Sequence, residues 1–147
     1  MDRGKLQAIW IKRTKGRPMD PAHSVTLVAG QGIAGNTDQG GKRQVTLFEQ
    51  EIWGALMEQV GGSLPLSERR GNLMTSGIRL RNSQGKVLRV GSCRIRIHGE
   101  TKPCRRMEEA QAGLREAMDG DWRGGAYGEV IEGGEVSVGD PVCWEEQ

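Results

Sequence analysis

The chain has 147 residues, 23 of them glycine, with 35% hydrophobic residues and a formal net charge of +2 at pH 7. This length fits a single domain over residues 1–147 with a core of ordinary size. Dispersed glycine without a Gly-X-Y period excludes collagen and argues against a helical bundle, because it suits short strands joined by tight turns. No apolar run is long enough for a membrane span, and the charge is too mild to indicate nucleic-acid binding.

In the first half of the chain, strand patterns precede one helical pattern. Residues 6–11 are apolar enough for a strand buried on both faces, and residues 24–29 alternate as a half-buried strand does. After a glycine-rich loop, residues 44–47 predict another short strand. Apolar side chains at helical spacing then predict a helix over residues 49–60, and the glycine pair 61–62 supplies its stop.

The second half is rich in strand patterns and holds one further helical pattern. Residues 73–80 mark one or two strands, and the turn-forming residues 83–86 lead into two more, at 87–90 and 93–98. A second helix is predicted over residues 105–118, ended by Gly120. Short strands at residues 129–131, 136–138 and 142–144 complete the pattern. The sequence therefore predicts a mainly β fold, a closed or nearly closed β-barrel with two or so short helices at its side.

Cys104 is the residue whose surroundings best suit chemistry. It lies between a predicted strand and the predicted start of a helix, with Lys102, Arg105 and Arg106 within two residues. A helix N-terminus and nearby cations favour the thiolate, which can act as a nucleophile, a persulfide carrier or a soft metal ligand. The alternative interpretation is a small buried hydrophobic residue, the usual role of a free cysteine.

The other two cysteines have simpler interpretations. Cys93 alternates with isoleucines and is expected in the core, and Cys143 lies among apolar residues and is expected to be structural. Three cysteines leave at least one unpaired within the chain. Because no secretion signal is recognised, we expect a reducing, cytoplasmic location in which all three are thiols.

Two short basic segments are candidate phosphate sites. One holds Arg69, Arg70 and Asn72, and the other holds Lys42 and Arg43 before the predicted strand at 44–47. Guanidinium groups match phosphate oxygens bidentately. Each segment taken alone is equally typical of a solvated turn. Together with Cys104, they predict a basic pocket that contains one thiolate.

Several motifs that would indicate other functions are absent or incomplete. Residues 30–35 spell G-x-G-x-x-G, but no helical pattern follows, so a dinucleotide-binding fold is not expected. The sequence has no C-x-x-C, and His23 and His98 do not lie at zinc-site spacing from the cysteines. Aromatic residues are too few for a base-stacking platform, which disfavours a nucleic-acid-binding barrel.

Several segments of the chain resemble motifs of the MOSC domain and occur in the same order as in that domain. The domain is named after the C-terminal part of molybdenum cofactor sulfurases. They are residues 32–35, 43–47, 70–73 with 77–78, Gly91, and 102–104. The resemblance covers about residues 10–144 and implies a β-barrel-like fold. One departure is Asn36, which stands where the family often has an acidic residue, with Asp38 two positions later.

The resemblance also implies a function with molybdenum cofactor, a phosphate-bearing pterin dithiolene. It implies that Cys104 carries sulfur as a persulfide, in cofactor sulfuration, or ligates molybdenum, in reduction of N-hydroxylated compounds. The expected cofactor-binding set is Arg43, Arg70, Asn72, Lys102 and Arg105. A sulfur transferase and a component of a molybdenum-dependent reductase both remain open, as does a non-catalytic module that binds and delivers the cofactor.

The expected partners follow from what the sequence lacks. It holds no pattern of the pyridoxal-phosphate domain found in large sulfurases, so this chain alone is not expected to bind pyridoxal phosphate. A separate cysteine desulfurase or electron-donor protein would then supply sulfur or electrons. We expect no membrane association and no nucleic-acid partner.

Overall fold

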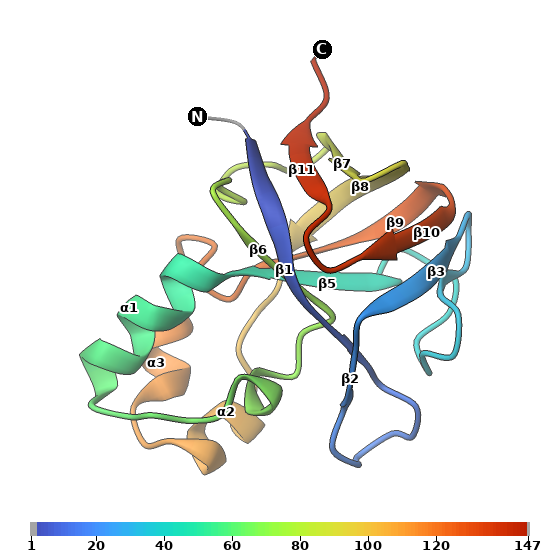
Figure 1. Ribbon diagram of the computed structural model, residues 1–147. Helices are drawn as coiled ribbons and strands as arrows, with labels where there is room; N and C mark the ends of the chain where they lie inside the picture. Colours follow the sequence, from blue (N-terminus) through green and yellow to red (C-terminus); the bar gives the residue numbers. More distant parts are fainter. Residues whose placement is uncertain (1–2, 147) are drawn as a thin grey trace.

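The computed structural model describes residues 3–146 and has a closed β-barrel at its centre (Figure 1). An eight-stranded sheet runs in the order β11-β7-β8-β9-β5-β6-β1-β2, and an additional β11–β1 pairing closes it, so seven strands form a ring and β2 extends from β1. The ring strands are β1 (Arg3–Ile11), β5 (Val45–Glu49), β6 (Leu73–Ser76), β7 (Val87–Val90), β8 (Cys93–Glu100), β9 (Ala126–Glu132) and β11 (Pro141–Trp144). The predicted mainly β, barrel-like fold is confirmed.

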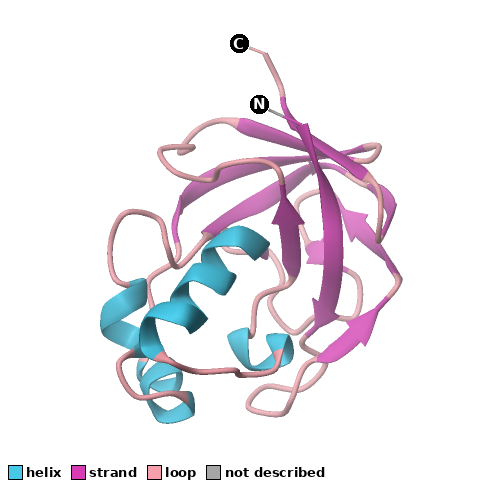
Figure 2. Cartoon of the chain, turned by 60° about the vertical axis from the view of Figure 1, so that its left-hand side comes forward, coloured by secondary structure: helices cyan, strands magenta, loops and turns pink. Residues whose placement is uncertain are grey.

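A smaller sheet and a helical layer complete the fold. The short strand β2 (Asp20–Ala22) leads into β3 (Ser24–Val28), which pairs with β4 (Gly32–Ile33) and β10 (Gly134–Ser137). The helices gather on one side of the barrel, as Figure 2 shows. They are α1 (Gln50–Val60), the 3₁₀ turn η1 (Leu66–Arg69), α2 (Arg105–Ala110) and α3 (Leu114–Met118).

Two hydrophobic cores lie back to back across the strands that face the helices. Leu47 and Leu73 belong to the cluster that includes the barrel interior, whereas their neighbours Phe48 and Met74 belong to a second cluster with α1, α2 and α3. In β1, Ile9 faces the first cluster and Trp10 the second. Successive side chains of a strand point to opposite faces. The predicted strand at residues 6–11 is therefore buried on both faces, as expected.

The helix predicted over residues 49–60 is confirmed, but the helix predicted over 105–118 is wrong as a single element. It is interrupted between α2 and α3, where Gln111 is extended and Gly113 has φ +84°. Glycine adopts this left-handed conformation without the steric cost that other residues incur. The break lets α3 turn so that its Leu114 and Met118 are buried in the helical core.

A cluster of ion pairs on the outside of the barrel stabilises the position of the last strand, β11. Glu145, just after β11, accepts hydrogen bonds from Arg94 Nε at 2.7 Å and Arg94 Nη2 at 2.6 Å, and from Arg89 Nε at 3.2 Å. The bidentate hydrogen bonding of Arg94 is the main cause that lowers the pKa of Glu145 to about 2. The end of β11 is thus held to β7 and β8 electrostatically as well as by strand pairing.

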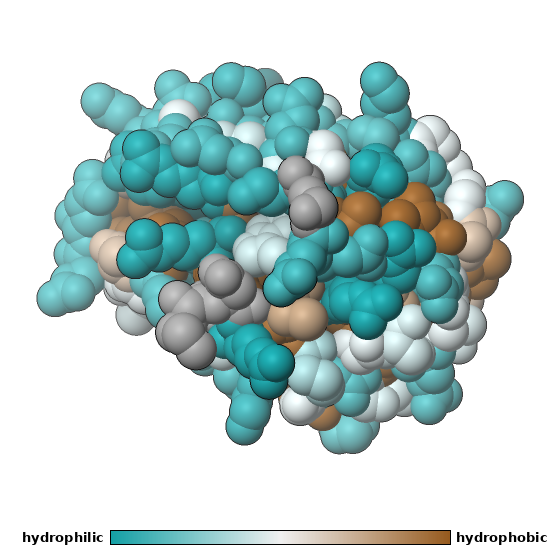
Figure 3. Space-filling model, turned by 90° about the horizontal axis from the view of Figure 1, so that it is seen from above, coloured by the Kyte–Doolittle hydropathy of each residue, from teal (hydrophilic) through white to brown (hydrophobic). Residues whose placement is uncertain are grey.

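The remaining surface is mostly polar. Seen from the end where the two termini lie, hydrophilic residues cover most of the surface, and hydrophobic residues show as smaller patches among hydrophilic and intermediate ones (Figure 3). None of the helices that the structure describes has the length and apolar character needed to cross a bilayer.

Several connecting segments lie close to one row of paired residues in the barrel sheet. A row of paired residues crosses five neighbouring strands: Ile9, Leu73, Leu47, Ala126 and Glu100. β1 and β8 end at or just after this row, whereas β6 begins on it and β5 two residues before it. Because β1 runs opposite to β6, residues 12–18 and 69–72 lie on one side of this row. Residues 101–104 follow β8 on the other side of the row and lead into α2.

Candidate functional site

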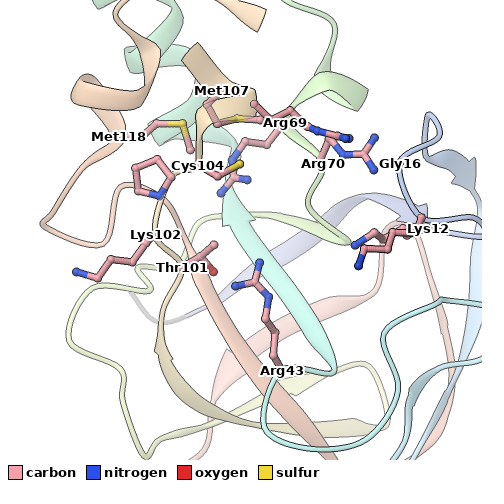
Figure 4. Close-up of a pocket in the computed structure, with 13 residues that line it drawn as sticks. Lys12, Gly16, Arg43, Arg69, Arg70, Thr101, Lys102, Cys104, Met107 and Met118 are labelled. Carbon is pink, nitrogen blue, oxygen red and sulfur yellow. The ribbon is translucent and has the colours of Figure 1, made fainter. Parts of the chain in front are cut away.

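Residues from these segments, from just before β5 and from α2 and α3 enclose a pocket of about 320 Å³. Its lining is strongly cationic, and no carboxylate belongs to it among the residues that the structure describes. The seven cationic side chains are Lys12, Lys15, Arg43, Arg69, Arg70, Lys102 and Arg106. Gly16, Thr101, Pro103, Cys104, Met107 and Met118 complete the wall (Figure 4). Since the whole chain carries a net charge of only +2, this pocket concentrates positive charge far beyond the average of the sequence.

Arg69 is the buried cation of the pocket, with 7% of its surface exposed. Its Nη2 donates to the backbone carbonyl of Gly124, and its guanidinium lies 4.9 Å from the centre of the Phe48 ring. Burial lowers the pKa of Arg69 to about 10, the charge of Arg43 acts in the same direction, and Cys104 opposes both. The side chain remains protonated at neutral pH, so it is a fixed, desolvated cation that favours an anionic ligand.

Arg70 joins the pocket to the loop that follows β1. Its Nη1 donates to the carbonyl of Arg17 at 2.9 Å, and its backbone has φ +61°, which directs its side chain differently from that of Arg69. Burial lowers the pKa of Arg70, as does the charge of Arg106, while Glu68 and Cys104 oppose the shift. Residues 12–17 therefore form one wall, with Arg70 as its anchor.

Thr101 contributes a polar group with no partner. The residue follows β8, its side chain is buried with 7% exposed, and its backbone N–H donates to the carbonyl of Gly125 at 2.9 Å. Its Oγ1 has no hydrogen-bond partner among the described residues. In Figure 4 this hydroxyl points towards the side on which Arg43 lies. Because an unsatisfied buried hydroxyl costs free energy, a ligand atom that pairs with it would be stabilised.

Cys104 is exposed at the edge of the pocket, immediately before α2. Its side chain makes no capping hydrogen bond to the helix, so the sulfur is not used in holding the fold. The buried side chains of Met107 and Met118 lie beside it in the pocket wall (Figure 4). Arg69 and Arg70 line the same pocket, so the thiol lies in a cationic surrounding.

Four of the six predicted site residues meet in this pocket. They are Arg43, Arg70, Lys102 and Cys104. The guanidinium of Arg43 also lies 5.9 Å from the centre of the Tyr127 ring. In Figure 4 the side chain of Lys102 extends away from Cys104, so its ammonium lies at the rim.

Arg105 and Asn72 do not line the pocket. Arg105 is exposed and pairs with Glu109, 3.5 Å away and one turn along α2. Asn72 is 4% exposed and uses its amide on the protein itself. Its Oδ1 accepts from the backbone N–H and hydroxyl of Thr46, and its Nδ2 donates to the Trp10 carbonyl and to Asn36 Oδ1.

Asn36 belongs to the same network. It accepts from the backbone N–H of Lys12 at 2.8 Å as well as from Asn72, while its own Nδ2 has no partner among the described residues. The amides of Asn36 and Asn72 thus tie the loop before β5 to β1 and to the start of β6. This explains how an amide can stand at position 36: it holds the ends of strands and does not face the pocket.

The structure adds residues that the sequence did not select. Arg69 stood beside Arg70 in a segment already singled out, but the sequence did not tell which of the two is buried. The basic run at residues 12–17 was the signal for Lys12 and Lys15. For Thr101 no signal existed, because its missing partner depends on tertiary packing alone.

Metal ligands other than Cys104 are scarce. No group of three or more His, Cys, Asp or Glu side chains able to hold a metal occurs within residues 3–146. A metal ion at this pocket would therefore take at most one such side chain and would need its other ligands from a bound molecule. Cys93 is fully buried, as predicted, and Cys143 is half-buried on β11.

Comparisons with known proteins agree on the fold. A family model described as the MOSC domain matches residues 31–143. YuaD from Bacillus subtilis has a TM-score of 0.82 at 16% identity, covering 99% of this chain and 97% of its own. YiiM from Geobacillus stearothermophilus has a TM-score of 0.79 at 17% identity, and the match covers 97% of this chain and 75% of the YiiM chain. YiiM from Escherichia coli has a TM-score of 0.72 at 18% identity, and the match covers 99% of this chain and 70% of the YiiM chain. No curated protein sequence matches the chain.

Proposed function

The chain belongs to the MOSC domain family, and on that premise we propose that it binds molybdenum cofactor in the pocket around Cys104. The observation that carries the proposal is the lining of this pocket: seven cationic side chains, one exposed thiol and one buried hydroxyl without a partner. Such a lining suits a molecule that carries a phosphate and presents a soft metal.

The residues fit the cofactor chemically. A phosphate has several oxygens that need donors, and the guanidinium of Arg69 and the free hydroxyl of Thr101 offer them from buried positions. A dithiolene supplies metal ligands of its own, which suits a pocket where Cys104 is the lone thiol. When bound, the cofactor supplies a molybdenum atom able to accept sulfur or to exchange oxygen with an N-hydroxylated substrate.

The chain's own residues have three tasks in this proposal. Arg69 and Thr101 bind the phosphate, and Arg43 and Arg70 neutralise the charge of the rest of the ligand. Cys104 carries a sulfur atom as a persulfide or serves as a metal ligand. In the carrier role a separate cysteine desulfurase is the sulfur donor, and in the reductase role an electron-donor protein is required.

The test is metal and pterin analysis of protein produced in a host that makes the cofactor. We expect molybdenum and pterin to copurify in a fixed ratio with the wild type. Arg69→Gln should lose most of both, because it removes the buried cation. In Cys104→Ser, pterin binding should largely remain while persulfide loading or molybdenum retention is lost.

Cys143→Ser is the matched control, because Cys143 lies outside the pocket and is the other cysteine with surface exposure. It should retain cofactor and sulfur loading. If wild-type protein carries no pterin from a competent host, or if Cys104→Ser loads sulfur and metal as the wild type does, the proposal is wrong.

A non-catalytic module that binds and delivers the cofactor is the second candidate, and the exposed position of Cys104 favours it as well as the first. Turnover separates the two. Reduction of an N-hydroxylated base by loaded protein with an artificial reductant, lost in Cys104→Ser, indicates an enzyme, whereas transfer of cofactor to an apo-enzyme without such turnover indicates delivery.

A further inference from the structure

The inner part of the pocket has the features of a site for a small dianion. Arg69 and Thr101 are both more than nine-tenths buried, and the hydroxyl of Thr101 has no partner among the described residues. The guanidinium of Arg69 gives one hydrogen bond to Gly124, and a guanidinium has five N–H donors. An oxyanion with several oxygens can therefore be bound by both residues at once.

The thiol of Cys104 lies next to this site and is open to solvent. It lines the same pocket as Arg69, Arg70 and Thr101. An anion bound at Arg69 thus lies beside a potential sulfur nucleophile. The surrounding cations offset the repulsion between a thiolate and an anionic substrate, which otherwise slows such a reaction.

We propose that the protein takes sulfane sulfur directly from thiosulfate, with Arg69 and Thr101 binding the sulfonate oxygens and Cys104 accepting the outer sulfur. The inference rests on the proposed role of Cys104 as a sulfur carrier and goes beyond it by naming a small inorganic donor. Thiosulfate is a dianion with three oxygens on one sulfur and a transferable second sulfur, so its two ends match the cationic and the thiol parts of the pocket.

The transfer balances without any other reactant. The Cys104 thiolate attacks the outer sulfur of thiosulfate and forms a new sulfur–sulfur bond. The original sulfur–sulfur bond breaks, and its electron pair leaves with sulfite. One negative charge remains on the Cys104 persulfide and two on sulfite, which equals the charge of the reactants. Arg69 and Thr101 stabilise the leaving sulfite by the same contacts that bind the substrate.

A second step returns the enzyme to its starting state in an assay. Cyanide attacks the outer sulfur of the persulfide, the sulfur–sulfur bond breaks, and thiocyanate leaves while the Cys104 thiolate is regenerated. Thiocyanate formation therefore reports turnover. Mass spectrometry after incubation with thiosulfate alone reports the persulfide as a gain of one sulfur atom.

The experiment measures both quantities for the purified protein. We expect thiosulfate-dependent thiocyanate formation and a sulfur adduct on Cys104, both absent in Cys104→Ser and both present in Cys143→Ser. Thr101→Val should raise KM for thiosulfate by roughly ten- to a hundredfold, because it removes one hydrogen bond to a charged ligand. Thr101→Ser should restore a low KM, since it keeps the hydroxyl. Circular dichroism verifies that each variant is folded.

A polysulfide control separates this inference from the proposed function. If polysulfide loads Cys104 but thiosulfate yields neither adduct nor thiocyanate, the thiosulfate inference is overturned and the sulfur-carrier role stands. If neither donor loads Cys104, both fail. A turnover that survives Cys104→Ser, or a KM that Thr101→Val leaves within twofold, also overturns the assignment of these residues.

Discussion

Gly71 provides a sharp test of how the fold supports the pocket. A methyl group at this position would lie 2.5 Å from Cδ1 and 2.8 Å from Cε1 of the Phe48 ring, far inside normal contact distance. The ring has little freedom to move, because it is 2% exposed and stacks on Trp10 with centroids 5.9 Å apart. The guanidinium of Arg69 lies 4.9 Å from the same ring. Gly71→Ala should therefore disturb both the helical core and the buried cation.

The expected size follows from these contacts. Overpacking of a rigid core costs about 1–3 kcal/mol, and replacing glycine by alanine returns about 0.4–1 kcal/mol by restricting the unfolded chain. The free energy of unfolding should fall by about 1–2 kcal/mol, which lowers Tm by roughly 2–8 °C for a domain of this size. Phosphate affinity should fall as well, because the displaced ring no longer supports Arg69.

Gly54→Ala is the matched control, since the same change is made where nothing lies within 4 Å, in an exposed part of α1. It should raise stability by about 0.5–1 kcal/mol, because alanine favours a helix over glycine. Thermal and urea unfolding measure stability, and calorimetric titration with phosphate measures affinity. If Gly71→Ala is as stable as the wild type, or if it shifts stability in the same direction as Gly54→Ala, the close approach to Phe48 does not exist.

Three further outcomes are expected. Glu145→Gln should lower Tm at neutral pH, because the carboxylate pairs with Arg94 only while it is charged. The folded pKa of Glu145 lies below its unfolded value, so the difference in Tm from wild type should vanish as the pH falls from 4.5 towards 2. A difference that persists at pH 2 would contradict this. Asn72→Ala should cost about 1–3 kcal/mol in urea unfolding for each buried backbone group it leaves unpaired, whereas a near-neutral effect would mean that the network carries no stability. Arg43→Gln should weaken phosphate binding several-fold in calorimetry, because Arg43 lines the pocket. Arg105→Gln should weaken it much less, because Arg105 lies outside the pocket and pairs with Glu109. Equal losses of affinity would refute the pocket assignment.

Local patterns predicted local structure well. The apolar spacing that ends at Gly61 gave the correct helix, since one face of α1 packs on the barrel and Gly61 adopts the left-handed conformation that stops it. The alternation around Cys93 and Ile95 correctly predicted a strand with its apolar side in the core. No helix was predicted after the G-x-G-x-x-G segment, and in the structure Gly32 and Ile33 of this segment form β4, which pairs with β3.

The errors lie where local pattern and tertiary structure disagree. The apolar stripe from Met107 to Met118 fits one helix, but Gly113 lets the chain break and pack each half differently. Asn72 stays a predicted cofactor-binding residue, but the structure adds amide partners at Trp10 and Thr46, far away in the sequence. Such partners depend on the register of the barrel strands, which no local spacing specifies.

The closure of the barrel by β11 has a consequence for biosynthesis. β9, which extends to Glu132, pairs with both β5 and β8, and the ring closes only when β11 pairs with both β1 and β7. In chain order β9 and β11 follow the other ring strands, so they emerge from the ribosome after them, and domains generally fold as units during synthesis. The walls of the pocket are thus made early but assembled late. Ligand capture therefore requires that β11 has been synthesised, and a nascent chain stalled before β11 would expose Cys104 without the assembled cationic pocket.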